Sequence, residues 1–349
     1  MTEERSTKII ANWIFIGVAM LIVQVLLGGI TRLTGSGLSI TEWKPIVGTL
    51  PPLNETQWQQ SFQQYQQIAQ YKYLNHHFTL SDFKFIFFWE WFHRLWARMI
   101  SIVFLIPFIY FIVKKYFKQW MIMPLIILFL LGGMQGAIGW IMVKSGLNDE
   151  NLYVNHIRLA IHFVSAMVLI CYALIFGLKL IIPQKDFIKD AGLKKYTAAI
   201  LVVVIIQLFY GAFMAGIKGA VAAPTWPDIN GMMVPTPFFS GDLSKDLFFN
   251  IINIHFIHRS LAYIIFVLIL IWWLKAKKQN SVSFNKAKHW PVVFVFVQIV
   301  LGIFALLNSP NIVLGHFGTF EWLAQLHQLT GMLLLLSLIS VFYLLRSNK

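Results

Sequence analysis

Eight long apolar segments dominate this chain and limit the folds that it can adopt. Of its 349 residues, 58% are hydrophobic and 12% are charged. A transmembrane helix needs about 20 mainly apolar residues. The segments cover residues 9–31, 84–113, 120–142, 156–181, 196–217, 250–274, 290–308 and 321–345. The first is too long for a signal-peptide core and lacks a small-residue cleavage site, so it is counted as a span. We therefore predict an all-α integral membrane protein with eight transmembrane helices.

The net charge of +14 is distributed unevenly between the two sides of the predicted membrane domain. With an even number of spans both termini lie on one side, and the segments on that side hold 17 of the 28 Lys and Arg residues. The positive-inside rule then predicts cytoplasmic termini in the cell (inner) membrane. The basic excess is interpreted as a topology signal, with attraction to anionic lipid headgroups as a second reading. It does not indicate nucleic-acid binding.

Four histidines lie in alternate apolar segments with a repeated spacing. His93 and His162 are 69 residues apart, as are His258 and His327, and the two pairs are offset by 165 residues. All four enter their segments from the side opposite the termini, at similar depth. Ionisable groups inside a membrane are costly, so each is a functional-site candidate. The duplication indicates two metal centres near the outer face, one in each half of the chain.

The other four segments each carry Gln-x-x-x-Gly, which places both residues on one helix face. The four copies are Gln24/Gly28, Gln135/Gly139, Gln207/Gly211 and Gln298/Gly302. One interpretation is helix packing, with glycine allowing close approach and glutamine bonding to a neighbouring helix. The other is that glycine leaves room for a flat cofactor that glutamine contacts. Both support two pseudo-symmetric four-helix bundles, with domains at residues 1–190 and 191–349.

Two histidines in each half favour haem over other metal groups. Zinc normally takes three or four protein ligands, and copper usually recruits Met or Cys. The single cysteine, Cys171, also excludes multi-cysteine centres. Haem needs two axial ligands, which facing helices of a bundle can supply. Arg94 and Arg259 directly follow a histidine in each half and could pair with haem propionates.

The two halves differ three residues before their His-Arg pairs. Glu90 precedes His93, whereas His255 precedes His258. An acid in an apolar pocket has its neutral form favoured, which predicts proton donation or uptake by Glu90. The alternative for Glu90 is an ion pair with Arg94 or Arg98. His255 is left without an assigned role, either lining the second pocket or lying at an interface.

These motifs resemble those of the haem A synthase family (CtaA-type), in its cysteine-poor branch that includes the mitochondrial enzyme. The segment Thr31-Arg-Leu-Thr-Gly-Ser-Gly-Leu-Ser39 is close to the family's TRLTxSGLS, and Glu90-Trp-Phe-His93-Arg94 matches its E-x-x-H-R. Further matching segments are Arg158-Leu-Ala-Ile-His162, His258-Arg259 and His327-Gln328. The resemblance covers nearly the whole chain and is weakest in the loop at residues 218–248.

The resemblance implies an oxidoreductase that converts haem O to haem A for cytochrome oxidase. The C8 methyl group would become a formyl group through two hydroxylations, with haem I as the intermediate alcohol. By the matching positions, His93 and His162 would hold the iron of the substrate haem, and Glu90 would be the catalytic acid. His258 and His327 would hold the iron of a haem b cofactor. A haem O synthase would deliver the substrate, and an unidentified donor would supply electrons.

Other functions also fit paired intramembrane histidines. A dihaem b-type electron-transfer protein would place them on four helices, although its haems usually lie near opposite membrane faces. A haem carrier is a third class, in which Glu90 has no evident task. Gly132-Gly133 is compatible with a homo-oligomer as well as with internal packing. The glutamine-rich loop at residues 34–83 is expected to form short amphipathic helices over the first pocket.

Overall fold

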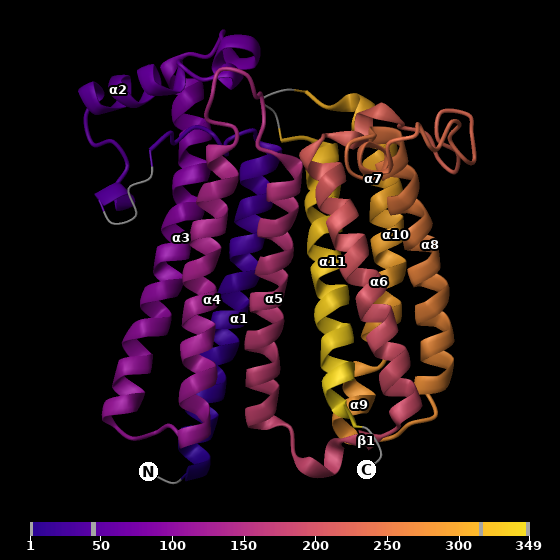
Figure 1. Cartoon of the computed structure of the whole chain (residues 1–349). Coiled ribbons are helices and arrows are strands. Elements are labelled where there is room, and N and C mark those ends of the chain that lie inside the picture. Colours follow the sequence, from indigo (N-terminus) through magenta and orange to yellow (C-terminus); the bar gives the residue numbers. More distant parts are fainter. Residues whose placement is uncertain (1–2, 43–46, 314–316, 347–349) are drawn as a thin grey trace. The chain divides into compact units, whose positions relative to one another are not determined.

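The computed structural model describes residues 3–42, 47–313 and 317–346, and the chain is almost entirely helical (Figure 1). Eight helical segments in these residues are long and apolar enough to cross a membrane. They are α1 (Glu3–Leu33), α3 (Leu80–Val113), α4 (Gln119–Lys144), α5 (His156–Ile181), α6 (Ala191–Gly216), α8 (Ile251–Ala276), α10 (Trp290–Asn308) and α11 (Thr319–Leu344). The seventh span also includes α9 (Val282–Ala287) and a 3-10 turn at Ser309–Asn311. The predicted spans are confirmed, with ends displaced by a few residues.

Backbone contacts divide the chain into two compact units. One consists mainly of Ile16–Ala166, and the other mainly of Met167–Ile312 and Gly318–Lys349 together with Met1–Phe15. In the first unit, the hydrogen bonds that tie α1 to α3 include those from Trp96 Nε1 to Met20 O (2.9 Å) and from Thr31 Oγ1 to Trp89 O (3.3 Å). Helix α3 also packs on α4. The predicted domain boundary at residues 190 and 191 stays a prediction.

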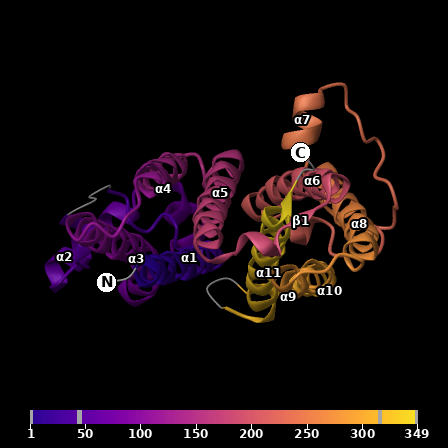
Figure 2. The same cartoon turned by 90° about the horizontal axis from the view of Figure 1, so that it is seen from below.

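The second unit contains a closed ring of four helices. Helix α6 packs on α8, α8 on α10, α10 on α11, and α11 on α6, and Figure 2 shows the four nearly end-on. The ring encloses apolar side chains with no exposed surface, which include Ile200, Ile269, Met332 and Leu338. Trp272 is also fully buried, and its indole donates to Thr197 Oγ1 at 2.8 Å. This bundle has the packed interior expected for the second half of the repeat.

Short elements connect and cap the long helices. Strand β1 (Ile188–Lys189) precedes α6 and pairs in parallel with β2 (Leu345–Arg346), directly after α11. Helix α7 (Leu243–Phe248) precedes α8, whose first amides are capped by the side chain of Asn250. Helix α3 begins with a capping box between Thr79 and Asp82, which satisfies backbone donors at its first turn. The remaining short elements are Val47–Thr49, Tyr71–Asn75, Gln184–Asp186 and Gly219–Ala222.

The loop between α1 and α3 folds as expected into short helices. Helix α2 (Glu55–Tyr65) buries Phe62 and Tyr65 against Phe83 and Phe87 at the start of α3. Burial raises the pKa of Tyr65 to about 12, so its hydroxyl remains protonated and donates to Gln70 Oε1 at 3.0 Å. The polar glutamines of α2 face outward. This loop therefore forms a compact cap on the amino-terminal end of α3.

Large apolar side chains cover the outer faces of the long helices. On α3 the exposed set includes Ile102, Ile106, Ile109 and Val113. A soluble protein rarely exposes so much contiguous apolar surface, whereas a lipid environment accommodates it. Together with the eight spans, these surfaces make the chain a multi-pass membrane protein.

Candidate functional site

Each of the four histidines packs against the glycine of a Gln-x-x-x-Gly motif on a neighbouring helix. A Cβ atom at that glycine would lie only 2.8–3.2 Å from the imidazole Cε1, closer than nearly all carbon contacts in proteins. The four distances are 3.2 Å for Gly28 and His93, 2.9 Å for Gly139 and His162, 3.2 Å for Gly211 and His258, and 2.8 Å for Gly302 and His327. The glycines therefore make room for the imidazole rings, so the motif serves helix packing around each histidine.

The glutamines of three motifs bond to the same histidines. Gln24 Nε2 donates to the backbone carbonyl of His93 at 3.2 Å, and Gln207 Nε2 donates to that of His258 at 3.0 Å. Gln298 Nε2 lies 3.2 Å from Nε2 of His327. The interpretation of glutamine as a bond between helices is confirmed for these three. His93, His258 and His327 are thus each positioned by a glycine and a glutamine of a neighbouring helix.

His258 and His327 face one another in the second unit. Their ring centroids are 6.4 Å apart, with an angle of 74° between the ring planes. Two metal–nitrogen bonds of about 2 Å each, together with two imidazole ring radii, place trans axial ligands roughly 6 Å apart between centroids. His327 Nδ1 lies 2.9 Å from the Gln298 carbonyl oxygen, to which it donates, so Nε2 carries the lone pair. This pair therefore fits axial coordination of a haem iron.

The first unit packs His93 of α3 and His162 of α5 against glycines, as the second unit does with its two histidines. Nδ1 of His162 is buried and has no hydrogen-bond partner among the described residues. No cluster of three or more His, Cys, Asp or Glu that could bind a metal occurs in the described parts of the chain. Two histidine ligands in each half fit haem better than zinc.

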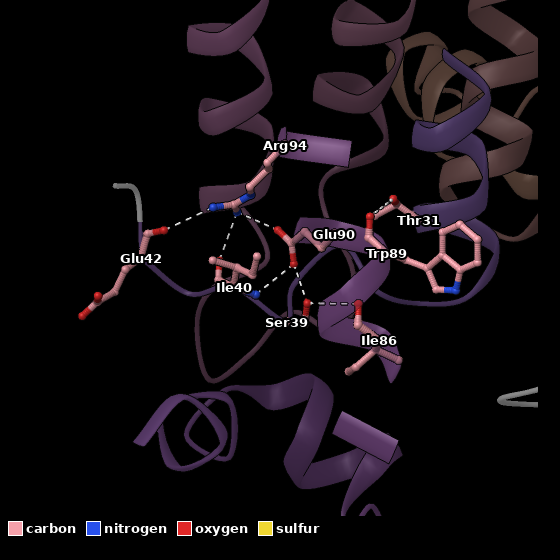
Figure 3. A network of polar contacts seen from close by, with 8 residues as sticks. All are labelled: Thr31, Ser39, Ile40, Glu42, Ile86, Trp89, Glu90 and Arg94. Atoms are coloured by element: carbon pink, nitrogen blue, oxygen red, sulfur yellow. Dashed lines mark hydrogen bonds and ion pairs between the residues drawn. The ribbon is translucent and has the colours of Figure 1, made fainter. Parts of the chain in front are cut away.

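Glu90 anchors a polar network one turn before His93 (Figure 3). Glu90 is 2% exposed. Its Oε2 accepts hydrogen bonds from Ser39 Oγ at 2.7 Å and from the Ile40 amide at 2.8 Å. Oε1 forms an ion pair with Arg94 Nη2 at 2.6 Å. Arg94 also donates to the carbonyl oxygens of Ile40 and Glu42, at 3.1 and 3.2 Å. Glu90 and Arg94 thereby fasten the segment that follows α1 to α3.

This network corrects the expected surroundings of Glu90. An apolar pocket was expected, but both carboxylate oxygens are occupied by donors. The alternative ion pair with Arg94 is confirmed. Ser39 and Ile40 were not predicted as site residues, although Ser39 ends the Thr31–Ser39 segment that carried the resemblance.

The second unit repeats this arrangement with His255 in the place of Glu90. Arg259 Nε donates to His255 Nδ1 at 3.0 Å, and its two other nitrogens donate to the carbonyl oxygens of Asp228 (2.7 Å) and Ala223 (2.8 Å). Each arginine therefore ties the loop after one helix to the histidine helix. The hydrogen bond from the Gly231 amide and that from Thr225 lower the pKa of Asp228 in this loop.

The arginine and histidine contacts bear on two residues left open by the sequence. His255 is 2% exposed, and its Nε2 has no partner among the described residues. Its Nδ1 accepts from Arg259, so His255 takes the place in this network that Glu90 takes in the first unit. Arg94 and Arg259 both donate to backbone carbonyl oxygens, and propionate binding by either stays a prediction.

Comparison with known proteins shows the family to which the chain belongs. Residues 11–339 match the family COX15-CtaA, described as cytochrome oxidase assembly protein. A haem A synthase of Flavobacterium johnsoniae is 38% identical over 318 residues, covering 89% of this chain and 93% of the relative. One of Bradyrhizobium diazoefficiens is 40% identical over 305 residues, covering 86% and 84%. One of Flavobacterium psychrophilum is 36% identical over 341 residues, covering 95% and 96%. The chain therefore belongs to the COX15-CtaA family of cytochrome oxidase assembly proteins.

Proposed function

We propose that this protein is a haem A synthase, an oxidoreductase that converts the C8 methyl group of haem O to a formyl group. Two successive hydroxylations would pass through haem I, and the product haem A would serve cytochrome oxidase. The observation that carries the proposal is the pair of two-histidine sites, built by one repeated motif and differing at Glu90 and His255. Two haem-binding bundles of the same design would provide one site for the substrate and one for a cofactor.

The first unit is the proposed substrate site. His93 and His162 would hold the substrate haem, with Gly28 and Gly139 keeping their rings in place. Glu90 is the proposed catalytic acid, and it would hold or pass protons at its carboxylate beside His93. Its carboxylate is paired with Arg94 at 2.6 Å. The cap on the amino-terminal end of α3 would limit the access of water to this site. Glu90, which the second half lacks, has a task in an enzyme and none in a haem carrier.

The second unit is the proposed cofactor site. His258 and His327 would bind haem b, because their rings face one another at 6.4 Å between centroids and Nδ1 of His327 is held by a backbone carbonyl, which leaves Nε2 as the nitrogen that could bind iron in place of Gln298. When bound there, haem b would supply one-electron transfer. Arg259 would lie at the polar margin of this site and favour the haem propionates. Each hydroxylation would take one oxygen atom from O2 and reduce the other to water, with two electrons from a separate donor protein or quinol.

The membrane arrangement and partners are part of this proposal. The charge bias supports cytoplasmic termini, which would place both histidine pairs toward the outer side of the inner membrane. Haem O is apolar and would reach the first unit from its synthase without leaving the membrane. The farnesyl tail of the substrate suits the apolar outer faces of the helices. A homo-oligomer is compatible with the small residues Gly132 and Gly133 on α4, where an added Cβ would meet no described atom within 4 Å.

Co-expression with a haem O synthase tests the proposed function. Haem is extracted from membranes of a host that makes no haem A, with and without this chain, and the pigments are separated by reversed-phase chromatography. Haem A should appear only when both proteins are present. Haem b bound to the chain without any haem A or haem I would instead support the dihaem electron-transfer protein. The same extraction with the His93→Ala variant is the control for the assigned substrate site.

Gly302→Ala tests the cofactor site without removing a ligand. The new methyl carbon would lie 2.8 Å from His327 Cε1, so the imidazole must move away from its present position. We expect the haem b content of the purified protein to fall about ten-fold, since disturbed ligand orientation typically costs 10–100-fold in metal affinity. Gly133→Ala is the matched control, because an added Cβ there meets nothing within 4 Å. Equal haem b in both variants, measured by pyridine haemochrome spectra, would contradict the assignment.

A further inference from the structure

Gln135 differs from its three counterparts in the Gln-x-x-x-Gly repeat. Gln24, Gln207 and Gln298 each bond to a histidine of the neighbouring helix. Both Nε2 and Oε1 of Gln135 are buried, and neither has a hydrogen-bond partner among the described residues. A buried amide that makes no hydrogen bond costs about 1–3 kcal/mol, so such a group needs a partner of its own. The missing partner of Gln135 is therefore expected to be a ligand.

The position of Gln135 points to the substrate pocket. It lies one turn before Gly139, whose Cβ position is 2.9 Å from His162 Cε1, and residues four apart share a helix face. Four residues span about 6 Å of helix. Helices α3 and α4 run in opposite directions, so this step leads away from Glu90 and Arg94 at the capped end of the unit. Gln135 therefore lies on the histidine side of α4, deeper in the apolar part of the first unit.

The chemistry of haem O supplies a group that fits this amide. Its charged propionates lie on one edge of the porphyrin and favour the polar end with Arg94. The opposite edge carries a hydroxylated ethyl-farnesyl side chain, which haem B lacks because it has a vinyl group there. That hydroxyl would then enter the deep end of the pocket. A hydroxyl both donates and accepts, and it can therefore satisfy an amide NH₂ and an amide oxygen.

We propose that Gln135 recognises the side-chain hydroxyl of haem O and so selects haem O over haem B in the first unit. This inference rests on the proposed function, since it takes the first site to be the substrate site. Binding of haem B leaves the Gln135 amide without a partner in an apolar pocket. A site built to bond a hydroxyl discriminates strongly against a ligand that lacks it, because the buried polar group remains unpaired. Gln135 is thus a specificity-determining residue that the repeat itself reveals.

Haem affinity in the full-length protein tests this proposal. Detergent-purified protein with an empty first site is titrated with haem O or haem B, and dissociation is followed by transfer to excess apomyoglobin. The His93→Ala variant defines binding outside the first site. In Gln135→Met, which keeps the length of the side chain and loses the hydrogen bonds, the preference for haem O over haem B should fall about ten-fold. The affinity of the variant for haem B should not fall. The part of the preference for haem O that comes from contacts of the farnesyl tail should remain.

Two further measurements make the result decisive. Gln207→Met, which changes a glutamine of the same motif in the second unit, should leave the preference of the first site unchanged. If the Gln135 variant fails to accumulate, the wild-type protein is titrated with haem O whose hydroxyl has been methylated, and its affinity should fall about ten-fold. An unchanged preference in Gln135→Met, or an equal fall in Gln207→Met, overturns the proposal. A wild-type protein that binds no haem O through His93 refutes the proposed function instead.

Discussion

Replacing Glu90 with Ala is expected to reduce haem A formation at least about 100-fold while leaving haem b bound, since a positioned acid or base typically contributes 10²–10⁴-fold. The carboxylate is buried one turn before His93 and paired with Arg94, so its loss removes the acid that is held in place in this network. Haem A and haem I are measured by chromatography of extracted pigments, and haem b by pyridine haemochrome spectra. Normal haem A in the variant would show that the assigned role of Glu90 is wrong.

The same carboxylate also fastens the Ser39–Ile40 segment to α3, so the experiment must separate chemistry from anchoring. Glu90→Gln keeps the volume and one acceptor oxygen while removing the charge. Ser39→Ala removes one anchoring hydrogen bond and leaves the acid intact. A catalytic role predicts a large loss in Glu90→Gln and a small one in Ser39→Ala. Similar losses in both variants, with less protein in the membrane, would indicate that Glu90 serves the fold alone.

His255→Gln is the matched control in the second unit. Glutamine can still accept a hydrogen bond from Arg259, whose present acceptor is His255 Nδ1 at 3.0 Å. We expect this variant to keep both haem b and haem A formation, because the iron ligands and the proposed acid are untouched. His255→Gln and Glu90→Gln change the equivalent position in the two units, so their effects can be compared directly. A loss confined to Glu90→Gln assigns the chemistry to the first unit.

The membrane fold could be predicted from the sequence because its physical cause is local. A bilayer requires long apolar helices, and each of the eight segments carries that signal within its own residues. The histidine pairs were also predictable, since polar groups stand out in apolar helices. The repeat in the sequence also predicted that α3 and α8 are equivalent. In the structure, Arg94 on α3 and Arg259 on α8 each hold a loop to their helix.

The surroundings of Glu90 could not be predicted in the same way. Its partners Ser39 and Ile40 are about 50 residues away in sequence, and one of the contacts is made by a backbone amide that no side-chain pattern reveals. The glycines of the Gln-x-x-x-Gly motifs posed a similar difficulty. Their spacing showed a common helix face, but only the packed helices show that each face receives an imidazole. Contacts between distant segments therefore decide what a motif does.

Replacing His258 with Ala is expected to remove haem b from the protein. The ring lies 6.4 Å between centroids from that of His327, which alone would leave a haem with one axial protein ligand. Losing even the partner of a ligand costs 10–100-fold in metal affinity, so loss of the ligand itself should lower haem b content by about ten-fold or more. The low-spin absorption spectrum of the reduced protein measures this directly.

The exposed His289 provides the control for the second unit, since it caps α10 and its Nδ1 accepts from Trp273. His289→Ala should keep the full low-spin spectrum. His93→Ala should also keep haem b while abolishing haem A, because its site is in the other unit. This pattern distinguishes a substrate site from a cofactor site, because a change in one histidine pair affects only the haem that this pair binds. An unchanged spectrum in His258→Ala would show that haem b binds elsewhere in the protein. It would also contradict the assignment of the substrate to the first unit and the cofactor to the second.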